Sequence, residues 1–267
     1  MKTFRLQELR PGVCAAIAEE GGVAIGNAGF VAAGGDVLVF DCTLSLTAGR
    51  ELREAAERQG RIEHVVYSHW HGDHVFGAGA MPAMAVVVAT ERTAALLEER
   101  AEPRLQDLKK SASEITEGPF AELARTELPQ VVIVYPDETF ADERAFDGAR
   151  ALTYGGGHTA SDAFLWLEEE RILFAADLVV VGTHPWIGDG DVREWRSILT
   201  RIAALEPETI VPGHGPVAGP EALEFMHEYL ETIERAESDA PVPKRYEALA
   251  SPDLWSRNLA ARSRVSS

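Results

Sequence analysis

The chain has 267 residues, of which 46% are hydrophobic and 7% aromatic, and its formal net charge is −18 at pH 7. This composition supplies enough apolar material for one large α/β domain or two small ones. A negative field of this size repels nucleic-acid phosphates and anionic membrane surfaces, so we expect neither nucleic acid nor membrane as a partner. Whether the protein forms a homo-oligomer is not decided by its composition, because composition reveals no contact surface.

Two further features of the composition concern the cell compartment. No segment approaches the ~20 apolar residues of a membrane span, and no unbroken apolar stretch of signal-peptide length precedes Glu19. We therefore expect a cytoplasmic protein. Cys14 and Cys42 are too few for a disulfide framework, and two buried free thiols are their expected state.

The first part of the chain is expected to begin with strands. Apolar runs bounded by glycine and charged residues predict strands at 13–18, 23–33 and 37–40. A helix with charge on one side then follows over 46–59. Next come a strand at 62–68, a short helix starting near Asp73, a strand at 84–88 and a helix at 91–102.

The middle of the chain, residues 103–129, is charged and has apolar residues at loosely helical spacing. We expect a helical insert near the active site, with a packed outer helix layer as the alternative. Strands are predicted at 131–134, 151–154, 163–167 and 171–174. Helices are predicted at 192–205, with Trp195 and Ile198 facing a sheet, and at 221–237. Residues 240–267 are expected to form a C-terminal tail.

The order of these elements indicates the fold class. Strands come first, and alternating strands and helices follow, in two sequential halves. This order suits an α/β (α+β) protein in which two mixed β-sheets pack face to face with helices outside, a four-layer αβ/βα sandwich.

Four side chains of the kind that binds metal lie within six residues, in the pattern His-x-His-x-Asp-His: His69, His71, Asp73 and His74. Residues two apart in an extended chain point the same way, so His69 and His71 can bind one ion together. Asp73 and His74 point different ways and are free to serve a second ion. Imidazole and carboxylate suit zinc, iron or manganese. The alternative, a polar histidine-rich surface loop, is weaker, because three of only 8 histidines cluster here.

Three more candidate ligands follow short apolar, strand-like runs. His158 comes after Gly155-Gly156-Gly157, Asp177 ends the run Phe174-Ala175-Ala176, and His214 lies between glycine and proline residues. Loops at the ends of strands in a rigid sheet are the usual place for such side chains.

Taken together, these motifs resemble the metallo-β-lactamase superfamily over residues 27–214. The resemblance implies one domain over 1–267 and a site for two divalent ions, expected to be zinc, with iron and manganese as alternatives. His69, His71 and His158 resemble the ligands of the first metal, and Asp73, His74 and His214 those of the second. Asp177 resembles the carboxylate that bridges both.

Such a site implies metal-assisted hydrolysis. Two ions that share a hydroxide generate a nucleophile at neutral pH. We assign catalytic roles to Asp73 and Asp177, which reduce the charge of the cluster and can accept the hydroxide proton. The expected reaction is cleavage of an ester, thioester or lactone of a small molecule. A mononuclear iron persulfide dioxygenase of the same fold is the alternative, and the metal would separate the two.

Some branches of the superfamily fit this sequence better than others. Glyoxalase II-like thioesterases and lactonase-like enzymes carry all seven ligands, as this chain does. The diiron flavoproteins have a glutamate at the position of His71. Ribonuclease-type members share the first motif, but the acidity of this chain disfavours RNA.

Outside the ligand set, four residues are candidates for the site. Asp41, at the end of an apolar run, is expected to support a metal-binding side chain, with a turn carboxylate as the alternative. Trp70, His184 and Trp186 are candidates for the substrate pocket. The alternatives are inward packing for the two tryptophans and an ordinary loop position for His184.

Overall fold

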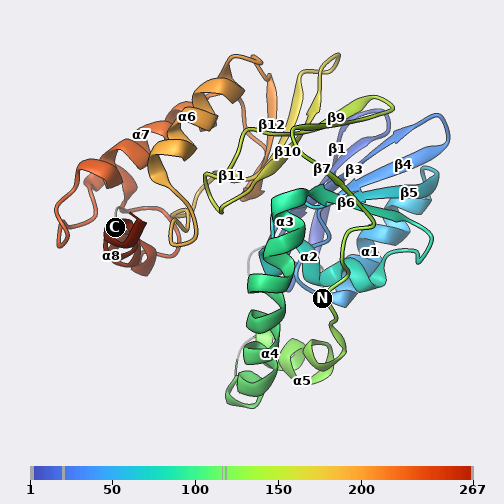
Figure 1. The fold of residues 1–267 in the computed structure, drawn as a ribbon, viewed down its shortest axis with the longest axis horizontal. Coiled ribbons are helices and arrows are strands. Elements are labelled where there is room, and N and C mark those ends of the chain that lie inside the picture. Colours follow the sequence, from blue (N-terminus) through green and yellow to red (C-terminus); the bar gives the residue numbers. More distant parts are fainter. Residues whose placement is uncertain (1–2, 20–21, 116, 118, 266–267) are drawn as a thin grey trace.

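The computed structural model describes residues 3–19, 22–115, 117 and 119–265. Two β-sheets pack face to face, and helices cover their outer faces (Figure 1). Both sheets are mixed, because each contains parallel and antiparallel pairs. The predicted four-layer αβ/βα sandwich is confirmed.

The first sheet has seven strands in the order of the chain, from β1 to β7. Neighbours from β1 to β4 run antiparallel, and those from β4 to β7 run parallel. The carboxyl ends of β4, β5 and β6 therefore meet at one edge. The strands are β1 (Phe4–Arg10), β2 (Val13–Ala18), β3 (Ala28–Ala33), β4 (Asp36–Phe40), β5 (Arg61–Val66), β6 (Val86–Thr90) and β7 (Glu138–Phe140).

The second sheet has five strands in the order β12-β11-β10-β9-β8. Its strands β8 to β11 are antiparallel, and β11 and β12 are parallel. All nine residues of β11 are buried, as expected for a strand covered on both faces. The strands are β8 (Glu143–Phe146), β9 (Ala149–Thr153), β10 (Ala163–Leu167), β11 (Ile172–Val180) and β12 (Thr209–His214).

Between the sheets lies a core to which both contribute. Val31, Phe40 and Val66 come from the first sheet, and Leu165 and Phe174 come from the second. The rings of Phe40 and Phe174 lie 6.2 Å apart between their centroids. Each such side chain stabilises the fold by roughly 1.5–3 kcal/mol through removal from water. This core holds the sheets at a fixed separation, and their shared edge is the rigid frame of the site.

Helices lie on both outer faces (Figure 1). In α6 the side chains of Trp195, Ile198, Leu199 and Ile202 recur at helical spacing and are buried against the second sheet, so the predicted placement of Trp195 and Ile198 is confirmed. The helices are α1 (Leu46–Glu57), α2 (Gly72–Val75), α3 (Glu91–Leu96), α4 (Glu102–Ser111), α5 (Pro119–Thr126), α6 (Val192–Ala203), α7 (Glu221–Arg235) and α8 (Asp253–Val265).

Two predicted strands differ from the structure. Residues 131–134 form no strand: Val131 and Ile133 are buried against the helices beside them and Val132 is 59% exposed, but no neighbouring strand lies alongside in the described part of the chain. Of residues 23–33, only Ala28–Ala33 form a strand. The preceding residues turn toward the second sheet, where the Asn27 amide donates to the carbonyl oxygen of Pro212 at 2.8 Å.

Some elements were not predicted at all. Strands β1, β7 and β8 are short or charged, so their sequences lack a clear apolar alternation. The C-terminal tail also carries more structure than expected. It contains α8, whose Trp255 is buried with Tyr229 and Tyr246 in the core beneath α6 and α7.

Cys14 and Cys42 are both free and buried, as predicted. Across the described residues, no helix combines the length and the apolar character that a bilayer crossing requires.

Candidate metal centre

The seven predicted ligands gather at one edge of the sandwich. Most follow a strand end, because the carboxyl ends of β4 and β5 in one sheet face those of β9 and β12 in the other. Asp177 departs from the expected position at a strand end, since it lies inside β11. Ala176, just before it, has a positive φ of 45°, and the pairing with β12 shifts register there. This bulge turns the aspartate toward the site.

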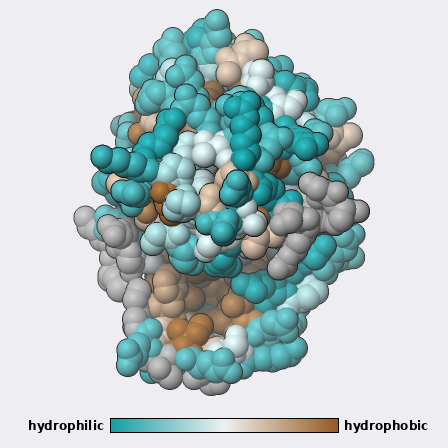
Figure 2. All heavy atoms as spheres, turned by 90° about the vertical axis from the view of Figure 1, so that its left-hand side faces the viewer, coloured by the Kyte–Doolittle hydropathy of each residue, from teal (hydrophilic) through white to brown (hydrophobic). Residues whose placement is uncertain are grey.

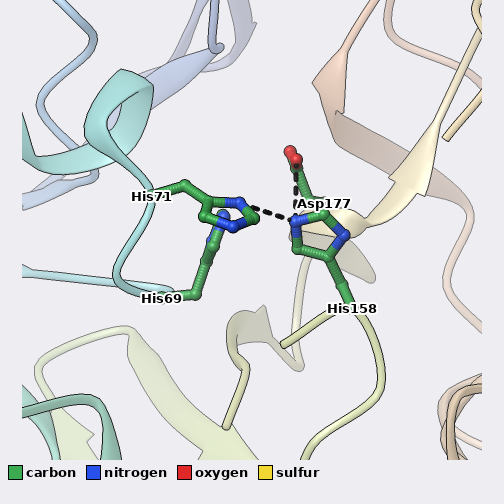
Figure 3. Close-up of side chains that lie close together, drawn as sticks. All are labelled: His69, His71, His158 and Asp177. Atoms are coloured by element: carbon green, nitrogen blue, oxygen red, sulfur yellow. Dashed lines mark hydrogen bonds and ion pairs between the residues drawn. The ribbon is translucent and has the colours of Figure 1, made fainter. Parts of the chain in front are cut away.

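The first group of ligands consists of His69, His71, His158 and Asp177, whose ligand atoms all lie within 4.8 Å of one another. Figure 3 shows the two histidines of the first motif facing His158 and Asp177 across a small space. Nε2 of His158 lies 2.9 Å from Nδ1 of His71 and 3.3 Å from Oδ2 of Asp177. Four donors converge on one point, as a single ion requires.

The second group consists of Asp73, His74 and His214, again with ligand atoms within 4.8 Å of one another. Nε2 of His214 lies 3.3 Å from Oδ2 of Asp73. Oδ1 of Asp177 lies 3.1 Å from Nε2 of His74 and 3.3 Å from Nε2 of His214. Asp177 therefore directs one carboxylate oxygen to each group.

The donors of both groups fit divalent metal ions. Nε2 of His69, Nε2 of His74 and Oδ1 of Asp177 are buried, and among the described residues none of them makes a hydrogen bond, although the last two approach each other at 3.1 Å. Buried polar atoms normally make hydrogen bonds, so buried atoms that make none and point into one shared space indicate a ligand-binding site. Imidazole nitrogen and carboxylate oxygen are ordinary ligands of zinc.

The protonation states of His69 and His158 also favour metal binding. Burial lowers the pKa of His69 well below its usual value, and nearby histidines lower it further. Burial likewise lowers the pKa of His158 to about 4, although Asp177 opposes the shift. Both imidazoles are therefore neutral at pH 7, and a neutral imidazole nitrogen is what coordinates a metal.

Asp41 holds ligands of both groups. Its Oδ2 accepts hydrogen bonds from Nδ1 of His74 and from the Ser68 hydroxyl, each at 2.7 Å, and its Oδ1 accepts from the Ser68 backbone N–H at 2.8 Å. The Ser68 hydroxyl in turn lies 2.9 Å from Nδ1 of His69. These contacts leave Nε2 of each imidazole facing the site, because they occupy the opposite ring nitrogen.

The other two histidines of the first group are held in a similar way. Nδ1 of His158 donates to the backbone oxygen of Trp186 at 3.0 Å. Nε2 of His71 lies 3.2 Å from Oδ2 of Asp189, which also accepts from the Trp186 indole at 2.7 Å. Sequence reasoning missed Asp189 and Ser68. Ser68 could have been identified because it adjoins the first motif. For Asp189 the only signal in the sequence is its position between Gly188 and Gly190.

Asp189→Ala is expected to weaken metal binding by about tenfold, because it removes a partner of one metal-binding histidine. The effect lies at the lower end of the usual range, since Asp189 is partly exposed and water can replace it. Zinc affinity measured by competition with a chromogenic chelator checks this. Asp191→Ala, two residues away at the start of α6, is the matched control. Equal affinity of wild type and Asp189→Ala would contradict the assigned role.

Gly213 leaves room for the Asp177 carboxylate. A Cβ at this position would lie 1.9 Å from Oδ1 of Asp177 and 2.6 Å from the carbonyl carbon of Ala176. Gly213→Ala is therefore expected to displace the carboxylate, reduce the metal bound per chain and lower the free energy of unfolding by about 1–3 kcal/mol. Elemental analysis and chemical denaturation measure both effects. Gly79→Ala, whose Cβ would meet only the end of the Leu46 side chain at 3.3 Å, should change neither.

A cavity of about 580 Å³ adjoins the ligands. Trp70 and Trp186 line it, and His184 does not. His184 is buried, with its Nδ1 at 2.7 Å from the Tyr229 hydroxyl. The remaining lining residues, apart from the metal ligands, are Ile25, Leu44, Gly72, Phe76, Arg104, Leu108, Asp189, Leu254 and Arg257.

Two segments left uncertain by the sequence border this cavity. Arg104 and Leu108 belong to α4, within the 103–129 segment, and Leu254 and Arg257 belong to α8. On the face that carries α8, Figure 2 shows a hollow with hydrophobic lining between hydrophilic rims. The cavity is thus framed by elements outside the two sheets.

Convergent imidazoles and carboxylates beside a cavity, at the edge of such a sandwich, are the arrangement expected of a metal-binding site. The family model of the metallo-beta-lactamase superfamily matches residues 21–214, and the chain belongs to this superfamily.

Individual relatives agree with this assignment. The chain is 30% identical to a beta-lactamase-like protein 2 homolog of Caenorhabditis elegans, over 79% of this chain and 64% of that protein. It is 25% identical to a metallo-beta-lactamase type 2 of Bacteroides fragilis, over 66% of this chain and 64% of that protein. The chain thus matches somewhat less than two thirds of each relative's length. A metallo-beta-lactamase from Hirschia baltica shares the fold, with a TM-score of 0.68 and 17% identity over 86% of this chain and 98% of that one.

Proposed function

We propose that the protein is a dinuclear metal hydrolase, with zinc as its metal, that cleaves an ester, thioester or lactone of a small molecule. One observation carries the proposal: the two oxygens of Asp177 face separate ligand groups, at 3.3 Å from His158 on one side and 3.1 Å from His74 on the other. A carboxylate placed this way suits two ions held side by side.

The residues around the cavity have separate roles in the proposed reaction. His69, His71, His158 and Asp177 would hold one ion, and Asp73, His74, His214 and Asp177 the other. Bound divalent ions lower the pKa of coordinated water to about 7 and polarise a carbonyl oxygen. The Asp73 carboxylate is the proposed proton acceptor, since the Asp73 side chain is 21% exposed and lines the cavity, whereas that of Asp177 is only 8% exposed.

The apolar walls of the cavity support this chemistry. Trp70 and Phe76 border the ligands and are both buried. Side chains of this kind exclude bulk water from the reacting bond, which strengthens the electrostatic interactions made there.

The alternative, a mononuclear iron persulfide dioxygenase, needs only one ion. The second group argues against it, because Asp73, His74 and His214 also converge and His74 is fixed by Asp41. A site for a single ion would not require that arrangement.

Metal content and hydrolysis together test the proposal. The protein is purified without chelators or metal-affinity columns and analysed by elemental mass spectrometry, and it is then assayed on lactones, thioesters, esters and a chromogenic β-lactam. About two zinc ions per chain and turnover of one of these classes are expected. About one iron per chain with persulfide-dependent oxygen uptake would establish the dioxygenase instead. No metal after reconstitution would refute both.

A further inference from the structure

The cavity beside the ligands carries two permanent positive charges. Arg104 comes from α4 and Arg257 from α8, helices from separate parts of the chain that both border the cavity. The other charged residues among its described lining are Asp73, Asp177 and Asp189, which serve the ligand groups or hold a ligand. Among the described lining residues of the cavity, no further carboxylate is present to pair with the two arginines.

Arg257 has a defined position. Its guanidinium carbon lies 4.8 Å from the centre of the Trp186 ring, and the Trp186 indole is itself anchored to Asp189 at 2.7 Å. A guanidinium stacked on an aromatic face keeps its N–H groups free for a ligand. Its ion pair with Asp253, at 3.6 Å, is between exposed side chains and is therefore weak.

Arg104 lines the cavity from α4. Arg104 and Leu108 are four residues apart on α4 and share one face, and Leu105 is fully buried and anchors the helix. Among the residues that the structure describes, Arg104 has no ion-pair partner. Leu254 and Arg257, three residues apart on α8, repeat this arrangement. Each helix thus presents one leucine and one arginine to the same space.

The placement of two arginines in this cavity contrasts with the negative charge of the chain as a whole. The chain carries a net charge of −18, so its overall field repels anions. Guanidinium groups bind carboxylates and phosphates through paired hydrogen bonds. A volume of about 580 Å³ suits a small molecule. We propose that Arg104 and Arg257 bind an anionic group, a carboxylate or a phosphate, on the substrate at a distance from the bond that is cleaved. This inference rests on the proposed hydrolase function and narrows its substrate class.

Matched substrates test it on the zinc-loaded protein. The set is a neutral alkyl thioester, the same thioester with a terminal carboxylate, and one with a terminal phosphate. Anionic members are expected to have a kcat/KM at least about tenfold higher than the neutral one, and the preferred anion identifies its class. Arg257→Gln and Arg104→Gln should each lower kcat/KM for that anion by about tenfold to a hundredfold, mainly through KM. Both should lower kcat/KM for the neutral substrate far less than for the preferred anion, so that the preference for the anionic substrate falls.

Two controls separate this effect from charge or folding. Arg235→Gln removes the same charge from an exposed side chain of α7, outside the cavity, and should behave as wild type. Arg257→Lys keeps the charge but loses the paired geometry, and should recover only part of the activity. Circular dichroism checks that each variant is folded.

Calorimetric titration of the zinc-loaded protein with a dicarboxylate and with inorganic phosphate gives a readout that needs no turnover. Wild type should bind one of these anions at least about tenfold more tightly than the Arg104→Gln, Arg257→Gln double variant. Equal binding by the two proteins would refute the arginine site, whether or not any substrate is hydrolysed. Hydrolysis without preference for the anionic substrates would also refute it, and would leave the hydrolase function intact. Absence of both metal and hydrolysis would instead refute the proposed function.

Discussion

Asp177→Ala is expected to abolish hydrolysis, with kcat/KM at least about a thousandfold lower. The variant loses a ligand from both groups at once, since one carboxylate oxygen faces His158 and the other faces His74 and His214. Metal ions contribute several kcal/mol of transition-state stabilisation, and about 1.4 kcal/mol corresponds to a factor of ten in rate. Bound zinc should fall from about two ions per chain to one or fewer. Steady-state kinetics and elemental analysis of the same preparation measure both.

Asp239→Ala removes an exposed carboxylate beyond α7 and should retain full metal content and activity. Full activity of Asp177→Ala with two bound ions would show that this carboxylate does not bridge the groups.

Asp41→Asn is expected to lower zinc affinity by about tenfold to a hundredfold, which is more than Asp189→Ala. Asp41 is almost fully buried and holds His74 directly and His69 through Ser68, so one substitution disturbs both groups. Asparagine keeps the size of the side chain and tolerates the positive φ of 60°. The amide NH₂ cannot accept the hydrogen bonds that one carboxylate oxygen now accepts, so His74 or Ser68 loses its partner.

Competition titration with a chelator measures the affinity of both zinc ions in Asp41→Asn. Asp36→Asn, at the other end of β4 and paired with Arg61 on the surface, is the matched control. Unchanged affinity for both ions would mean that Asp41 only stabilises the turn after β4.

The sequence could predict the ligand groups because their signals are local. His69, His71, Asp73 and His74 are adjacent in the chain, and His158 and His214 each follow a strand-like run next to glycine. Parallel strands bring their carboxyl ends to one edge, so residues far apart in sequence meet there.

The supporting residues and the cavity could not be predicted, because they depend on packing between distant segments, and such packing leaves no local pattern in the sequence. Asp189 supports His71 across 118 positions of the chain. Arg104 and Arg257 lie on α4 and α8, which are far apart in the sequence and both border the cavity. The position of His184 could not be predicted either, because the sequence around it does not reveal that the rings of Tyr229 and Trp255 pack against it.

The bulged position of Asp177 within β11 bears on how the two halves of the chain depend on each other. The first four ligands come from the half that forms the seven-stranded sheet, and the last three from the half that forms the five-stranded one. Neither half alone completes either coordination sphere. We therefore expect metal uptake to require chains whose two halves have docked in register, so that the metal content of a preparation would report its fraction of correctly assembled molecules.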